Sequence, residues 1–231
     1  MVKAHDFEEI LRAGRWFGGL ARDFQGALLD AAAVRKLGKE ERLFARGDAP
    51  NGLYGLVQGT IRVAGTSSGG VEVLLALVEP PMWFGEVSML DGSPRTHDAV
   101  SGDESTLVHV PQALLEAILA REPRHWRDVA VLAATRLRIM YSMAEDAGQP
   151  IAVRLARRLV LSAERYGDWH DRSSRTVGVR QEQLAAMLSS SRQTVNQLLK
   201  RLEADGAIRL SYGQVEILDL DALRDAARPQ G

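Results

Sequence analysis

Residues 84–96 combine the chemical groups that a sugar phosphate needs. Glu86 supplies a carboxylate, which accepts hydrogen bonds from sugar hydroxyls. Arg95 supplies a planar, permanently charged guanidinium that matches a phosphate, and Thr96 adds a hydroxyl and a backbone N–H beside it. Gly85 lets the backbone approach a phosphate closely. These residue types predict a pocket for a sugar-phosphate ligand, with an ordinary surface turn at residues 91–94 as the alternative interpretation.

The order of residues in this segment resembles the phosphate-binding cassette of cyclic-nucleotide-binding domains. In that family, Phe-Gly-Glu, an aliphatic run, a Gly-x-Pro turn and an arginine followed by Ser, Thr or Ala recur in the order found here. The resemblance implies that Glu86 holds the ribose 2′-hydroxyl and that Arg95 holds the cyclic phosphate. His97 and Asp98 depart from the small residues that the family often has after the motif. The remaining cassette positions assigned to the ligand are Gly85, Val87, Ser88 and Thr96.

Length and composition limit the classes of protein to consider. The 231 residues suit two small domains or one large one, and 45% of them are hydrophobic, which is enough for real cores. The sequence has neither a long apolar run nor a signal peptide, so we expect a cytoplasmic protein without a membrane partner. Cysteine is absent, which excludes disulfides and thiolate metal sites. The five histidines lack metal-ligand spacing, so we expect no metal.

The chain begins with a helical region and then changes character. Residues 5–35 predict short helices, one of them at 24–34. From residue 41 to residue 110, short apolar segments alternate with glycine turns, and this pattern predicts an all-β sandwich or barrel. Pro111 then fits the first position of a following helix.

Residues 125–147 form a long helical pattern without glycine or proline, which ends at the Gly-Gln-Pro sequence 148–150. A helix of this length beside a small β-domain has little surface of its own chain to cover it. We therefore expect its apolar row to form the seam of a two-fold homodimer, with packing on its own domain as the alternative. The row comprises Val129, Leu132, Arg136, Ile139, Met143 and Asp146, with Ala133, Met140 and Ala147 beside it.

Residues 180–205 predict a helix-turn-helix. Leu184, Met187 and Leu188 give the first helix a buried face, and serines at 189–191 break the run and offer N-caps for the second helix. The second helix carries long hydrogen-bonding side chains near its start, and 207–218 predicts a β-hairpin wing. Residues 149–231 also carry a surplus of basic side chains. An αα-hairpin of another kind of domain is the alternative.

The side chains of this second helix match the chemistry of DNA recognition. Arginine reads guanine and glutamine reads adenine in the major groove. Ser189, Ser191, Thr194 and Lys200 are the expected phosphate contacts. We expect Asn196 to face outward as well.

The order of these parts resembles the CRP/FNR superfamily of bacterial transcription regulators over residues 16–220. The resemblance implies an α+β fold with an N-terminal β-roll (double-stranded β-helix or jelly-roll) for a cyclic nucleotide, a long dimerisation helix and a C-terminal winged helix-turn-helix. The implied regions are 1–124 for the effector, 125–148 for the dimerisation helix and hinge, and 149–231 for DNA. Arg192, Gln193 and Gln197 occupy the family's base-reading positions.

The resemblance also implies a mechanism and partners. A cyclic nucleotide such as cyclic AMP is the expected effector, and it would rotate the DNA-binding domains of a homodimer onto a palindromic operator in double-stranded DNA. RNA polymerase is an expected partner, through the polar loop 167–174. The family's adenine-reading positions fall at Ile139 and Met140, neither of which carries a hydroxyl. The nearby residues that could contact the base instead are Arg136, Arg138, Tyr141 and Ser142.

Two other kinds of function stay open at this point. The same regulator could respond to a cyclic dinucleotide, to haem or to no effector at all. An enzyme is disfavoured because the sequence has no Ser/His/Asp cluster, no P-loop and no paired acids on a helix face, and no nucleophile stands beside Glu86 and Arg95.

Overall fold

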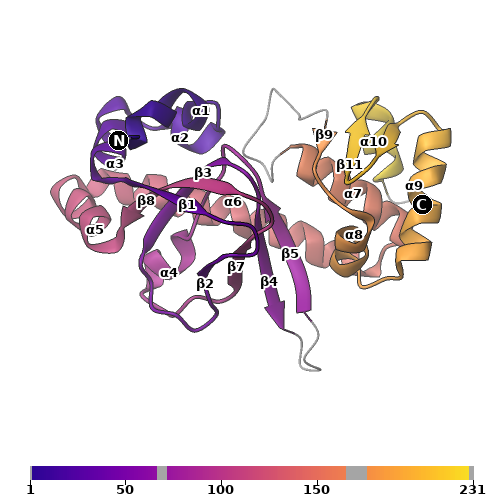
Figure 1. Ribbon diagram of the computed structural model, residues 1–231, viewed down its shortest axis with the longest axis horizontal. Coiled ribbons are helices and arrows are strands. Elements are labelled where there is room, and N and C mark those ends of the chain that lie inside the picture. Colours follow the sequence, from indigo (N-terminus) through magenta and orange to yellow (C-terminus); the bar gives the residue numbers. More distant parts are fainter. Residues whose placement is uncertain (1, 67–71, 165–175, 229–231) are drawn as a thin grey trace. The chain divides into compact units, whose positions relative to one another are not determined.

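The computed structural model describes residues 2–66, 72–164 and 176–228 (Figure 1). The chain forms two compact units. The first comprises Met1–Gly65 and Leu75–Leu137, and the second comprises Thr66–Leu74 and Arg138–Gly231. The long helix α6 (Trp126–Glu145) contributes to both.

Short helices open the first unit, as the sequence predicts. They are η1 (Ala4–Phe7), α1 (Glu8–Arg12), α2 (Arg15–Gly19) and α3 (Arg22–Ala31). The helix predicted at 24–34 ends early, because Ala32 is already extended and Val34 pairs with Val108 in a sheet. The β-branched side chain of Val34 suits a strand better than a helix terminus.

Two four-stranded sheets follow, with strand orders β1-β8-β3-β6 and β2-β7-β4-β5 (Figure 1). The alternation of apolar segments and glycine turns therefore predicts the β-rich architecture correctly. Six of the seven residues of β3 are buried, so this strand is covered on both faces. The strands are β1 (Ala33–Leu37), β2 (Arg42–Phe44), β3 (Gly52–Gln58), β4 (Ile61–Thr66), β5 (Glu72–Val78), β6 (Trp83–Phe84), β7 (Asp98–Ser101) and β8 (Ser105–Pro111).

Three further helical segments complete the first unit: α4 (Glu86–Asp91) between β6 and β7, then α5 (Gln112–Arg121) and η2 (Pro123–His125). Pro111 is the residue before α5 and not its first helical residue, because it is extended at ψ 143° and still belongs to β8. Its missing N–H is tolerated there for the same reason as at a first helical position.

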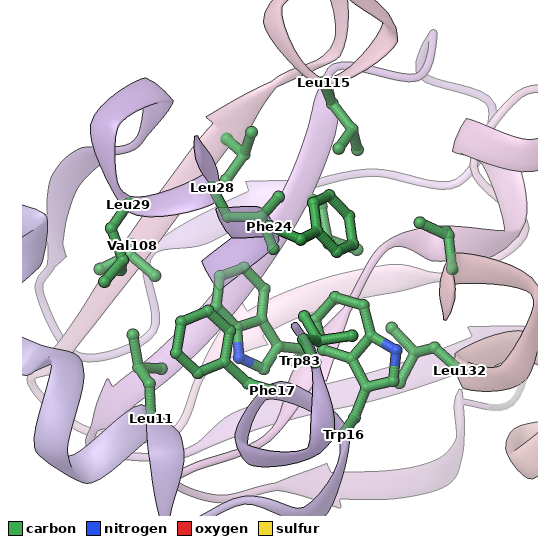
Figure 2. Close-up of a cluster of buried hydrophobic side chains, with 14 of the residues drawn as sticks. Leu11, Trp16, Phe17, Phe24, Leu28, Leu29, Trp83, Val108, Leu115 and Leu132 are labelled. Atoms are coloured by element: carbon green, nitrogen blue, oxygen red, sulfur yellow. The ribbon is translucent and has the colours of Figure 1, made fainter. Parts of the chain in front are cut away.

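An aromatic cluster lies in the core of the first unit. Trp83 is 1% exposed, stacks on Phe17 with ring centroids 5.3 Å apart and contacts Trp16 at 5.4 Å. Trp16 also donates its indole N–H to the carbonyl of Asp128 at 2.7 Å, which ties α2 to the start of α6. Figure 2 shows these rings among leucines of the surrounding elements. This packing fixes the position of β6, the strand that leads into the candidate cassette.

The apolar row expected to form a dimer seam packs instead on its own chain. Val129 and Leu132 are 0% and 2% exposed and belong to the core cluster of the first unit. A different row of α6 is exposed, and Leu137 and Tyr141 are its largest members. The prediction of a seam at Val129 and Leu132 is therefore wrong. Apolar residues lie on both sides of this helix, and spacing alone does not tell which side the β-domain covers.

The second unit holds the predicted winged helix-turn-helix (Figure 1). Its three strands form one antiparallel sheet in the order β10-β11-β9. The helix that follows the hinge runs from Ile151 to Ala163, and the loop 167–174 expected to meet RNA polymerase lies outside the described residues. The elements are η3 (Asp146–Gly148), α7 (Ile151–Ala163), β9 (Thr176–Val177), α8 (Gln181–Met187), α9 (Arg192–Ala204), β10 (Ile208–Ser211), β11 (Gln214–Ile217) and α10 (Leu220–Ala226).

Two arginines of α7 hold the ends of neighbouring helices. Arg154 donates to the carbonyl of Leu188, the C-cap of α8, at 3.2 Å. Arg157 donates to the carbonyl of Ala227, the C-cap of α10, at 2.6 Å. Cations are favourable at helix C-termini, so α7 organises the domain through charge as well as through its apolar face.

Two neighbouring leucines of α5 test this description of the core. Leu115 is 0% exposed, and its replacement by alanine should lower the free energy of unfolding of the first unit by about 2–5 kcal/mol. Leu114 is 48% exposed, and its replacement by alanine should change it by less than about 0.5 kcal/mol. Urea denaturation of both variants measures the difference, and equal losses would contradict the assigned core.

Candidate functional site

The candidate cassette begins with a sharp turn between β6 and α4. Gly85 is the N-cap of α4 and has a left-handed backbone, with φ 98° and ψ 4°. A Cβ at this position would lie 3.0 Å from the carbonyl oxygen of Gly52 and 3.1 Å from Nη1 of Arg95. Glycine is therefore required here by conformation and by space. The turn places Glu86 at the first position of the helix, where it is 4% exposed.

The carboxyl of Glu86 is buried among basic side chains. Burial raises the pKa of Glu86 above its usual range, whereas the charge of Arg136 and, less strongly, that of Arg95 lower it. Arg136 lies on α6 within the first unit and donates to the carbonyl of Trp83 at 3.1 Å. The structure thus collects one carboxyl and two guanidinium groups around the start of α4.

Arg95 is held in place by backbone and amide oxygens. Its Nη1 donates to the carbonyl of Gly85 at 2.8 Å. Its Nη2 donates to Oδ1 of Asn51 at 2.6 Å and to the carbonyl of Gly52 at 2.8 Å. The guanidinium also lies over the ring of Phe44, 4.5 Å from its centroid. These contacts fix the orientation of a side chain that is only 3% exposed.

One donor of Arg95 has no acceptor. The Nε atom is buried and makes no hydrogen bond within the described structure. A buried guanidinium N–H without an acceptor is costly, and an anionic oxygen is the acceptor that suits it best. Burial lowers the pKa of Arg95 and the charges of Tyr54, Glu86 and Asp48 raise it, so a nearby anion would further stabilise the charged form. The site can therefore accept a phosphate oxygen.

The other cassette residues differ from one another in exposure and in hydrogen-bond partners. Val87 is 45% exposed on the outer side of α4. Ser88 is 3% exposed, and its hydroxyl donates to the carbonyl of Pro94 at 3.4 Å, across the turn. The hydroxyl of Thr96 lies 2.8 Å from Nδ1 of His97. The structure thus brings Gly85, Glu86 and Arg95 together. The hydroxyls of Ser88 and Thr96 instead form hydrogen bonds within the same loop, to Pro94 and His97.

His97 is one of the departures from the usual motif. Burial, together with the charge of Arg46, lowers the pKa of His97, and Asp98 acts in the opposite direction. We therefore expect His97 to be neutral at pH 7, so the charge in the pocket comes from the arginines.

Ile139 and Met140, the predicted base-reading positions, lie on α6 beyond Leu137, in the part assigned to the second unit. Ile139 is 9% exposed and Met140 is 42% exposed. Their contact with a base stays a prediction. Asn51 is a partner of the site that the sequence does not indicate, because it lies 44 residues before Arg95 with no motif around it. Arg136, predicted to lie in the dimer row or near the base, lies close enough to Glu86 to lower its pKa.

The second candidate site is the helix-turn-helix of α8 and α9. Ser191 caps α9, and its hydroxyl accepts a hydrogen bond from the backbone N–H of Thr194 at 3.0 Å. The two hydroxyls lie 2.8 Å apart. Ser189, in the turn, is exposed and has φ 50°. The cap gives Ser191 and Thr194 a structural role, beside the phosphate contacts predicted for them.

The side chains predicted to read bases project from the start of α9. Arg192, Gln193 and Gln197 are exposed, and so is Lys200, the predicted phosphate contact on the same helix. Gln193, Gln197 and Lys200 lie on one face of the helix, because they are spaced by four and then three residues. Val195 and Leu199 are fully buried on the opposite side. Asn196, which was expected to face outward, is half-buried and accepts a hydrogen bond from Gln181 at 3.3 Å.

The wing closes a groove beside these helices. The groove has a volume of about 330 Å³ and lies between the start of α8, α9 and the turn of the β10–β11 hairpin. Tyr212 at this turn is fully exposed, and Arg180 lines the groove. Neither residue is among the predicted DNA contacts. An exposed aromatic at a hairpin tip and a cation just before a helix are signals that could have found them.

The described part of the chain contains no cluster of three or more His, Cys, Asp or Glu residues that could hold a metal ion. Among the described helices, none has the length and apolar character needed to span a membrane.

A candidate anion site at Arg95, followed along the chain by a winged helix-turn-helix, is the arrangement of a DNA-binding regulator with a ligand-binding domain. The model of the cyclic nucleotide-binding domain matches residues 34–122, and the model of the Crp-like helix-turn-helix domain matches residues 153–226. The chain belongs to the CRP/FNR family of transcription regulators.

Individual relatives extend over nearly the whole chain. It is 30% identical to the cyclic AMP receptor protein of Thermus thermophilus, over 91% of this chain and 95% of that protein. It is 29% identical to the CRP-like cAMP-activated global transcriptional regulator of Mycobacterium tuberculosis, over 96% of this chain and all of that protein. The crystal structure of the Thermus thermophilus catabolite activator protein matches with a TM-score of 0.51 and 29% identity, covering 92% of this chain and 98% of that chain.

The raised pKa of Glu86 predicts an unusual effect on stability. A carboxyl whose pKa is higher in the folded state than its ordinary value of 4.5 loses its stabilising effect as the pH rises from that value. Glu86→Gln should therefore raise the free energy of unfolding at pH 7, and the gain should shrink as the pH falls toward 4.5 and be absent below it. Denaturant titrations at several pH values measure this. A variant less stable than the parent at pH 7 would show that Arg136 stabilises the carboxylate more than burial destabilises it.

Proposed function

We propose that the protein is a homodimeric transcription regulator whose affinity for its operator is set by a cyclic nucleotide, with cyclic AMP as the leading candidate. The observation that carries the proposal is the buried Nε of Arg95, which has no acceptor in the described structure and lies near the buried carboxyl of Glu86. The names of the cyclic-AMP-linked relatives support the choice of effector.

Each group of the ligand has a matching group in the cassette. The cyclic phosphate would accept hydrogen bonds from Nε of Arg95 and would meet the backbone at Gly85, where no side chain intervenes. The ribose hydroxyl would donate to the carboxylate of Glu86. We assign the supporting contacts to Val87, Ser88 and Thr96, and the base to Ile139 and Met140 or to Tyr141 beside them.

The absence of a hydroxyl at Ile139 and Met140 favours a second candidate, in which the same pocket takes a cyclic dinucleotide. Both ligands share the ribose and phosphate that Glu86 and Arg95 match. The choice between them therefore depends on the base contacts.

Calorimetric titration with cyclic AMP, cyclic GMP and cyclic di-GMP tests the pocket. Charge-assisted hydrogen bonds contribute about 1.5–3 kcal/mol, so Arg95→Ala should weaken binding by about 10–150-fold. Arg62→Ala removes a half-buried arginine that pairs with Glu40 in the same unit, and it should leave the affinity unchanged. If none of the three nucleotides binds to the parent protein, or if Arg95→Ala binds as tightly as the parent, the proposed ligand site is wrong.

The exposed row of α6 supports a dimer. Leu137 and Tyr141 are 50% and 63% exposed, and Ala130, Ala134 and Ala144 complete an alternating spacing of four and three residues. This is the spacing at which two helices pack along a shared seam, and the small alanines permit close approach. We therefore assign the homodimer contact to this row.

A charge at the centre of this row tests the dimer. Leu137→Glu places a carboxylate from each subunit in a seam without water, so the dimer dissociation constant should rise by at least about tenfold. Leu114→Glu changes a leucine of similar exposure, 48%, on α5 and should leave the dimer intact. Sedimentation equilibrium measures both. A parent protein that is monomeric at all concentrations, or a dimer unaffected by Leu137→Glu, would contradict the assignment.

We propose that residues 1–124 bind the effector, that 125–148 form the dimerisation helix and hinge, and that 149–231 bind DNA. Helix α6 follows the cassette domain and leads into the DNA-binding region, and Arg136 on it influences Glu86. A ligand at Glu86 would therefore bias the helix. A coupling of about 1–3 kcal/mol is sufficient for a switch. RNA polymerase remains a proposed partner, through loop 167–174.

Lys200 distinguishes phosphate contact from base reading. Lys200→Ala should weaken binding to all DNA sequences alike and should lower the slope of log affinity against log salt by about one per protomer. Lys36→Ala removes an exposed lysine of the first unit and serves as the control. Fluorescence anisotropy at several salt concentrations measures the slope. Weakening confined to one DNA sequence would show that Lys200 reads a base.

A further inference from the structure

The recognition arginine is held by an acidic residue of the preceding helix. Nη1 of Arg192, the first residue of α9, lies 3.0 Å from Oε1 of Glu182 in the first turn of α8. The adjacent Gln181 donates to Asn196, one helical turn further along α9, at 3.3 Å. The first turn of α8 thus holds two successive turns of α9 through polar contacts on the same flank.

This ion pair contributes little to stability. The side chains of Arg192 and Glu182 are 68% and 56% exposed, and exposed pairs contribute about 0–1 kcal/mol. A carboxylate near a DNA-reading helix also repels phosphates. The position of Glu182 therefore calls for an explanation other than folding.

An exposed arginine has many rotamers, and holding one of them at a base edge costs conformational entropy. An arginine that is free to move also binds the DNA phosphates, and these contacts carry no sequence information. The contact with Glu182 occupies Nη1 of Arg192 and leaves Nη2 and Nε to donate elsewhere. Two donors in this fork match O6 and N7 of guanine.

We propose that Glu182 is a positioning residue that sets the base specificity of Arg192. This inference rests on the proposed role of Arg192 in reading DNA. The carboxylate holds the guanidinium in the orientation that reads a base edge and keeps it away from neighbouring phosphates. Specificity is gained in this way at the expense of overall affinity for DNA.

The experiment compares Glu182→Ala, Glu182→Gln and Arg192→Ala. Operator sequences are first selected from a random library with the parent protein, in the presence of the nucleotide if one is found to bind. Competition binding at fixed salt then measures discrimination among the four bases at each position of a half-site, together with affinity for unrelated DNA. Glu216→Ala is the matched control, because Glu216 pairs with Arg209 on the wing at 2.9 Å in a similarly exposed ion pair.

Arg192→Ala identifies the base pair that Arg192 reads. At that base pair, Glu182→Ala should reduce discrimination by about tenfold, within the range of one bidentate contact, and should bind unrelated DNA more tightly than the parent. Glu182→Gln should keep most of the discrimination, because its amide oxygen still accepts from Nη1, while it too binds unrelated DNA more tightly. Glu216→Ala should keep the discrimination of the parent.

Three results would overturn the inference: unchanged discrimination in Glu182→Ala, an equal loss at every position of the half-site, or equal losses in Glu182→Gln and Glu182→Ala. If Arg192→Ala itself changes discrimination nowhere, the proposed reading by Arg192 fails and the inference fails with it. If Arg192→Ala loses base discrimination and Glu182→Ala does not, the inference about Glu182 is rejected, while the proposed reading by Arg192 stands. Thermal unfolding of each variant establishes that the domain is folded.

Discussion

The guanidinium of Arg95 is the contact on which the proposed effector site depends. It joins the segment at Asn51 and Gly52 to the turn at Gly85, and a side chain at Gly85 would obstruct this arrangement. The arginine is buried with one donor unsatisfied, and beside it Glu86 is buried with a raised pKa. Several buried polar groups that are unfavourable for folding and lie close together are typical of a binding site. A bound ligand provides the hydrogen-bond and charge partners that these groups lack in the protein.

The DNA-binding unit also contains an arginine that is oriented by oxygen acceptors of the protein. Arg95 is oriented by three oxygens and Arg192 by one carboxylate, and in each case some donors are occupied by the protein while others remain for the ligand. The surrounding elements make this orientation stable. Ser191 caps α9, and Arg154 of α7 holds the C-terminus of α8. If both arginines bind as proposed, their fixed orientation lowers the entropy lost on binding.

Much of this arrangement can be predicted from the sequence, because its signals are local. The cassette motif, the glycine-punctuated strands and the capped recognition helix each lie within a few tens of residues. Contacts between distant segments could not be predicted in this way. Asn51 has no motif that links it to Arg95, and the strand at Val34 forms because β8 lies beside it. The apolar residues of α6 indicate a helix with two packing faces, but only the fold decides that Val129 faces the core and Leu137 faces outward.

The central claim is that a nucleotide at Arg95 controls DNA binding by α9. The most direct test is the dissociation constant for a selected operator, measured by fluorescence anisotropy at fixed salt with and without saturating cyclic AMP, for the parent protein and for Arg95→Ala. The account predicts that the nucleotide tightens operator binding by the parent by at least about fivefold, the lower end of common allosteric couplings, and that Arg95→Ala does not respond. Equal operator affinity of the parent with and without a nucleotide that calorimetry shows to be bound would contradict it.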